Sequence, residues 1–75
     1  MNGFTAWLVY ARRPAELLDS IVITDKTGTT MASRPLAYGA ARHHSWDTAL
    51  RQLGYARASK WAEVSGGHVC DVEPA

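Results

Sequence analysis

The chain is poor in cysteine and proline and has no large excess of either charge. Its one cysteine, Cys70, excludes an internal disulfide, so packing alone must hold the fold together, as is usual in a reducing compartment. Eight Lys or Arg residues against seven Asp or Glu residues leave a formal charge of +1. This balance excludes a polycation that binds nucleic acid through bulk charge, and also a highly charged disordered tail.

A long hydrophobic run is also missing. The apolar stretch from Phe4 to Ala11 is far shorter than the roughly 20 residues that a membrane-spanning helix needs. Arg12 and Arg13 follow this stretch, whereas the basic residues of a signal peptide precede its apolar segment. We therefore expect a cytoplasmic protein.

The length of 75 residues leaves room for one domain, residues 1–75, with one thin core. A chain of this size buries only about 60% of its unfolded surface, so little is left to wall a deep pocket. We therefore expect no enzyme activity and no cofactor. The composition is nevertheless that of a folded protein, because 47% of the residues are hydrophobic and three Trp and three Tyr are among them.

The clearest local pattern is a helix over about 45–53. Ser45 is a suitable N-cap, and Gly54 is a suitable stop signal. Between them, apolar residues recur at the spacing of one helical face: Trp46, Ala49, Leu50 and Leu53.

A β-hairpin over about 60–73 follows the predicted helix and turns back near Ser65-Gly66-Gly67. With a two-residue turn at Gly66-Gly67, Trp61 faces Val72 and shares the core face with Cys70. With a three-residue turn, Trp61 moves to the other face and becomes available to a partner, because a one-residue slip exchanges the two faces. We favour the two-residue turn, since it buries the largest apolar side chain.

The first half of the chain predicts three strands. Residues Thr5–Arg12 are β-branched or aromatic and apolar on both faces, which indicates a strand buried on both sides. Ile21–Thr24 and Thr29–Arg34 read as a hairpin with a turn at Asp25–Gly28, and Pro35 ends it.

For two segments the sequence allows two alternative structures. Pro14–Ser20 is either a short helix with Pro at its first position or a loop. Residues 36–44 are either a loop or the first turn of the helix, and Gly39 favours the loop. Together the elements predict an α+β fold, with a small antiparallel sheet and one main helix packed on one of its faces.

The string Asp25-Lys26-Thr27-Gly28-Thr29 resembles the phosphorylation motif of the P-type ion-pumping ATPases. The resemblance covers five residues. It implies that the Asp25 carboxylate takes a phosphoryl group while Lys26 and Mg²⁺ balance the charge. The chain has no second motif of the GDG type, and Asp, Thr and Gly are also the residues that turns favour. We favour the turn and keep phosphotransfer as a remote alternative.

A metal site is a second remote alternative. The residue types of the three histidines and the cysteine suit zinc, but their spacing fits no usual finger or knuckle. Two of them would share one strand face, as a base and a nucleophile would, but we identify no group to orient them. We therefore expect surface histidines and a buried thiol. The residues concerned are His43, His44, His68 and Cys70.

The prediction of function rests on the distribution of charged residues and on the number of tryptophans. No Lys or Arg follows Lys60, whereas Glu63, Asp71 and Glu73 do, so a folded molecule can have a basic side and an acidic side. Three Trp residues are many for so small a core. One that is left outside beside Arg has the chemistry of a protein-binding hot spot.

We therefore predict a small non-enzymatic binding protein that covers or bridges a surface of a larger protein or protein–nucleic-acid assembly. Phages and mobile elements often encode such products to inhibit or regulate a host machine. Direct nucleic-acid binding through a basic face is the alternative, although a pI of about 8.0 is low for it, and a homo-oligomer is left open. The residues expected to contact the partner are Arg12, Arg13, Arg42, His43, Arg51 and Trp61.

Overall fold

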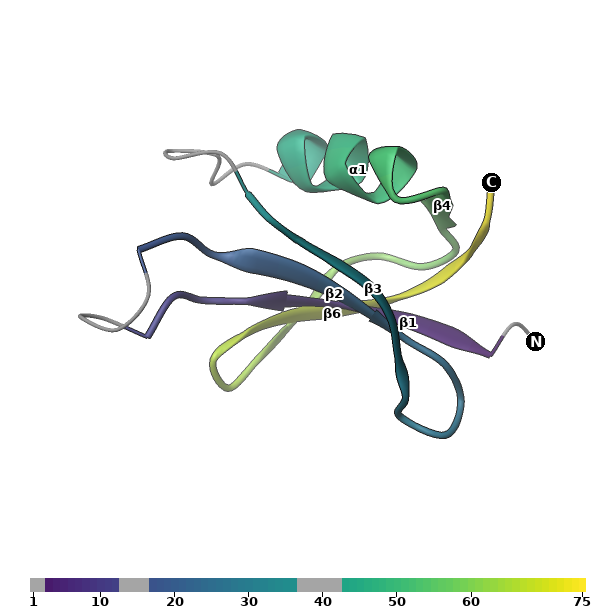
Figure 1. Cartoon of the computed structure of the whole chain (residues 1–75), viewed down its shortest axis with the longest axis horizontal. Coiled ribbons are helices and arrows are strands. Elements are labelled where there is room, and N and C mark those ends of the chain that lie inside the picture. The colour runs from purple at the N-terminus through teal and green to yellow at the C-terminus, as the bar shows by residue number, and fades with distance from the viewer. Residues whose placement is uncertain (1–2, 13–16, 37–42) are drawn as a thin grey trace.

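The computed structural model describes residues 3–12, 17–36 and 43–75 (Figure 1). The side chains of His43 and His44 lie outside the described part. Within these ranges, six strands and one helix follow one another. They are β1 (Phe4–Val9), β2 (Ser20–Thr24), β3 (Thr30–Pro35), α1 (His43–Gln52), β4 (Tyr55–Arg57), β5 (Ala62–Val64) and β6 (Gly67–Pro74).

The strands form one antiparallel sheet in the order β3-β2-β1-β6-β4, and β5 also pairs with β6. The sheet curls, and α1 lies across one of its faces (Figure 1). β6 is the organising strand, because one edge of it pairs with β1 along six residues. Its other edge pairs with β5 near the start and with β4 near the end. The predicted α+β fold with one helix on a small antiparallel sheet is confirmed.

β1 alternates between a buried and an exposed face. Ala6 and Leu8 are buried in the core, whereas Trp7 is 40% exposed and Val9 is 37% exposed. The prediction that this strand is buried on both sides is therefore wrong for one face. Among the described residues there is one helix, α1 (His43–Gln52), and it covers only one side of the sheet.

The β2–β3 hairpin forms as predicted, with its turn after Asp25. Ile21 and Ile23 face the core, and the pairing register of the two strands shifts between Ile23 and Thr24. Leu17–Asp19 are not helical, and the rest of the possible Pro14–Ser20 helix lies outside the described residues. Of the ambiguous segment 36–44, Leu36 is buried, and residues 37–42 lie outside the described part.

α1 begins at His43, two residues before the predicted start. Ser45 is consequently the third helical residue, and the prediction that it caps the helix is wrong, because an N-cap residue has a non-helical backbone. The predicted apolar stripe is confirmed: Trp46, Ala49 and Leu50 are buried and Leu53 packs against them. Gly54 ends the helix with φ 93°, a left-handed conformation that favours glycine.

The C-terminal hairpin turns at Ser65-Gly66, one residue earlier than predicted. Val64 therefore pairs with Gly67 and Ala62 with Val69. This register differs by two residues from the one that we favoured, so the same side chains share each face. Trp61 accordingly lies on the core side, as predicted, and β4 is a strand that the sequence did not predict.

Two tryptophans close the core between α1 and the β4–β5 connection. Trp46 and Trp61 are 4% and 9% exposed, and their rings meet edge to face at 5.4 Å. The Trp61 Nε1–H donates to Asp47 Oδ1 at 3.1 Å, and Arg57 Nε contacts the same oxygen at 2.9 Å. Asp47 thus satisfies a half-buried indole donor and ties the helix to the end of β4.

Gly67 allows β6 to lie close against β1. A Cβ at this position would lie 1.7 Å from the Leu8 carbonyl oxygen, which no small adjustment relieves. The neighbouring Gly66 is required for a different reason. It has φ 82° at the turn, and a Cβ added there would meet no atom within 4 Å.

These two glycines give a matched test of the register. We expect Gly67→Ala to lower the free energy of unfolding by about 3 kcal/mol, because it forces β6 away from β1. Gly66→Ala should cost only about 1–2 kcal/mol, the strain of a left-handed alanine. Urea unfolding followed by circular dichroism measures both, and an equal or reversed order would contradict the close approach at Gly67.

Candidate functional site

The sheet face opposite α1 is apolar, and no helix or strand of the described residues covers it. We call it the outer face and define it by Trp7, Val9, Val22, Val64 and Val69. In the strand register, Trp7 lies directly between Val22 of β2 and Val69 of β6. Trp7, Val9 and Val64 are about 40% exposed, and Val22 and Val69 are half-buried.

Trp7 is held in one orientation on this face. Its Nε1–H donates to Thr24 Oγ1 at 2.9 Å, which satisfies the polar atom of the ring. Val22 and Val69 flank it on the two neighbouring strands. A large aromatic side chain that is already ordered loses little entropy on binding, so Trp7 is suited to anchor a partner.

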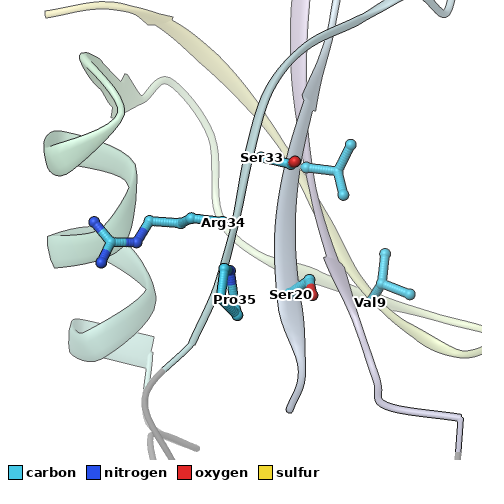
Figure 2. A pocket seen from close by; sticks show the side chains of 6 residues that line it. Val9, Ser20, Ser33, Arg34 and Pro35 are labelled. Atoms are coloured by element: carbon cyan, nitrogen blue, oxygen red, sulfur yellow. The ribbon is translucent and has the colours of Figure 1, made fainter. Parts of the chain in front are cut away.

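Two shallow depressions flank Val9. The first, of about 280 Å³, lies over β2 and β3 and includes Ser20, Ser33 and Pro35. Figure 2 shows Val9 and Ser33 on its side of the strands, whereas the Arg34 side chain extends towards α1. The second, of about 330 Å³, lies beside the β5–β6 turn. It is lined by residues 7–12 of β1 and its continuation and by residues 64–67 of the turn.

Charged residues lie at both ends of the outer face. Asp71 pairs with Thr5 near the start of β1, so its side chain lies on the same face as Trp7, and it is exposed. Glu73, two residues further along β6, also lies on this face. At the other end, Arg12 is exposed and borders the larger depression.

The structure does not bring the predicted contact residues together. The Phe4 ring lies 5.5 Å from the ring of Tyr55, which follows Arg51 by four residues, so Arg51 is near the start of β1. β1 then extends for roughly 17 Å before it reaches Val9 and, beyond it, Arg12. Arg12 and Arg51 therefore lie at opposite ends of the sheet.

The remaining predicted contact residues fall into two groups. Arg13 and Arg42 lie outside the described residues, and of His43 only the backbone, the first residue of α1, is described. Trp61 is a core residue with a satisfied indole donor, and little of it is available to a partner.

The exposed tryptophan is Trp7, which we had assigned to a strand buried on both sides. One signal in the sequence could have identified its face as the solvent face. The positions that alternate with the buried residues of β1 and β2 include Thr5, Ser20 and Thr24, whereas the core positions are all apolar.

The Asp25–Thr29 segment is a hydrogen-bonded turn. Asp25 Oδ1 accepts from Thr27 N at 2.8 Å, from Thr27 Oγ1 at 2.6 Å and from Thr29 N at 3.0 Å. These hydrogen bonds lower the pKa of the Asp25 carboxyl below its usual 3.8, and the bond from the Thr27 hydroxyl has the largest effect. Asp25 Oδ1 therefore already accepts hydrogen bonds from three donors within the turn. Gly28 closes the turn with φ 88°.

His68 and Cys70 share one face of β6, as expected, and Cys70 is buried. The expectation that the histidines lie on the surface is wrong for His68, because this is the core face and His68 is half-buried. The His68 ring packs 4.8 Å from Trp46, and its Nδ1 is 3.0 Å from the Tyr10 hydroxyl. Burial raises the pKa of the Cys70 thiol to about 12, so the thiolate that a nucleophile or a metal ligand requires is disfavoured. Among the described residues, no group of three His, Cys, Asp or Glu side chains is placed to hold a metal ion.

The comparisons with known proteins give no relative. No protein-family model matches the chain, and neither does a curated protein or a solved structure. In the described ranges, no helix has the length and apolar character to cross a membrane.

The raised pKa of Cys70 predicts how stability depends on pH. The unfolded thiol loses its proton above pH about 9, whereas the folded thiol keeps it until pH about 12, so the free energy of unfolding must fall between these values. Cys70→Ala should show a smaller fall over the same range. Unfolding of both proteins in urea between pH 8 and the alkaline limit measures the difference, and identical slopes would contradict the burial of the thiol.

Proposed function

We propose that this chain is a small non-enzymatic binding protein that covers part of the surface of a larger protein with its outer face. The observation that supports the proposal is Trp7, which is 40% exposed, hydrogen-bonded to Thr24 and set between two valines on a sheet face that no described helix or strand covers. Aromatic anchors of this kind, surrounded by apolar contacts that exclude water, are typical of binding hot spots.

The chemistry of the outer face favours a protein partner over a nucleic acid. Valines give no stacking platform for bases, and Trp7 is the one aromatic side chain at the centre of the face. Asp71 and Glu73 at one end would repel phosphates. Of the described arginines, Arg34 extends to the helix side and Arg57 is paired with Asp47, so neither adds positive charge to this face.

A role as an inhibitor or regulator in the cytoplasm is consistent with this mode of binding. A rigid sheet face with one anchor can block a surface without any chemistry of its own, because the preformed face keeps the entropy cost of association low. Direct nucleic-acid binding is the outcome that the experiment below must exclude.

The test starts from the partner that co-purifies with the tagged chain from its source cells and is then prepared in pure form. We expect Trp7→Ala to weaken its affinity by about 30-fold or more, since loss of a hot-spot anchor costs about 2 kcal/mol or more. Arg51→Glu on the helix side is the matched control and should change the affinity by less than about threefold.

Salt separates the two classes of partner. A fourfold increase in salt should change the affinity of a Trp7-centred protein contact only slightly, whereas binding to phosphates would fall by orders of magnitude. A complex that survives Trp7→Ala, or one that Arg51→Glu and salt both disrupt, would contradict the proposal.

A further inference from the structure

We propose that Thr24 is the positioning residue that lets an apolar surface of the partner cover Trp7, because its hydroxyl accepts the indole N–H of Trp7 within the interface. The inference rests on the proposed function, since it concerns the same outer face. It adds the chemistry of the partner. The group that covers Trp7 presents carbon atoms to the ring and no hydrogen-bond acceptor to its nitrogen.

The hydrogen bond that supports this inference lies on the outer face and joins two neighbouring strands. Val22 is opposite Trp7 and Thr5 is opposite Thr24, so Thr24 is the diagonal neighbour of Trp7 on β2. The Trp7 Nε1–H donates to Thr24 Oγ1 at 2.9 Å. Thr24 is half-buried, so its hydroxyl lies beside the ring at the sheet surface.

Trp7 therefore has the acceptor that a covered indole requires, although it is 40% exposed. An indole has one donor and no acceptor, and a buried donor that finds no acceptor is costly. Trp61 in the core meets the same requirement through Asp47. In the free chain, water can serve the donor of an exposed indole in place of Thr24. Under an apolar partner water is excluded, and only Thr24 remains.

The surroundings of the ring indicate which partner atoms fit it. Val22 and Val69 lie opposite Trp7 on the two neighbouring strands, and Val9 follows it on the same face of β1. Thr24 already occupies the one polar atom of the ring. A carbonyl or carboxylate of the partner aimed at this point would lose its water without gaining the indole hydrogen bond. The site thus selects aliphatic or aromatic side chains and disfavours acceptors.

The first experiment follows the indole proton of Trp7 in the free, full-length chain. Its resonance is the one that Trp7→Phe removes from the ¹H–¹⁵N spectrum. Thr24→Val should raise its rate of exchange with water by about threefold or more, whereas Thr24→Ser keeps the oxygen and should stay near the wild-type rate. Equal exchange in wild type and Thr24→Val would overturn the inference, whatever the chain binds.

The second experiment is titration calorimetry of the same variants with the purified partner protein on which Trp7→Ala is tested. Thr24→Val should raise the dissociation constant by about tenfold or more, because burial then leaves the indole donor unpaired. Thr24→Ser should stay within about threefold of wild type, since it restores the acceptor.

Thr30→Val is the matched control for the change from hydroxyl to methyl on this face. Thr30 lies opposite Thr24 on β3, and its hydroxyl makes no hydrogen bond to a described residue. Its replacement should therefore change the dissociation constant by less than about threefold. An equal loss in Thr30→Val and Thr24→Val would overturn the inference.

Thermal unfolding by circular dichroism separates binding from stability. Thr24→Val should unfold at nearly the wild-type temperature, because water accepts the indole proton in the free chain. A large fall in its unfolding temperature would show a merely structural role and overturn the inference. If Trp7→Ala weakens binding and Thr24→Val does not, the inference alone is wrong. If Trp7→Ala leaves binding unchanged, the proposed function is wrong.

Discussion

The register between β6 and β1 is the constraint on which the other features depend. Gly67 lies against the Leu8 carbonyl so closely that no other residue fits without moving the strand. This contact sets which side chains of β6 face α1 and which face outwards, since a slip of one residue would exchange them. It thereby places Cys70 and Val72 in the core and Val69 beside Trp7.

The core closes on one side of the sheet only. α1 supplies Trp46, Ala49 and Leu50, and the β4–β5 connection folds Trp61 against the helix, where Asp47 accepts from its indole. Among the described residues, these elements cover one face of the sheet and leave the other face without a helix. The opposite face therefore leaves Trp7, Val9 and Val64 about 40% exposed, and the proposed binding function rests on this exposure.

Much of the fold was predictable because its signals are local. The apolar period of α1, the β-branched residues of β2 and the Asp25 turn each follow from a few neighbouring residues, and the faces of the C-terminal hairpin were right although its turn comes one residue earlier than predicted. The site was not predictable in the same way. The topology places Arg12 and Arg51 at opposite ends of the sheet. β4 has only three residues, too few to show an alternating hydrophobic pattern. Whether Trp7 is covered depends on the face against which α1 packs.

The central claim is that Trp7 is the tryptophan that faces solvent, while Trp46 and Trp61 pack against each other inside. Acrylamide quenching of tryptophan fluorescence, in a dilute monomeric sample, tests it most directly. The account predicts that Trp7→Phe removes the red-shifted, easily quenched part of the emission and leaves two protected tryptophans. If Trp7→Phe left the quenchable fraction unchanged and Trp61→Phe removed it instead, the assignment of the two faces would be wrong.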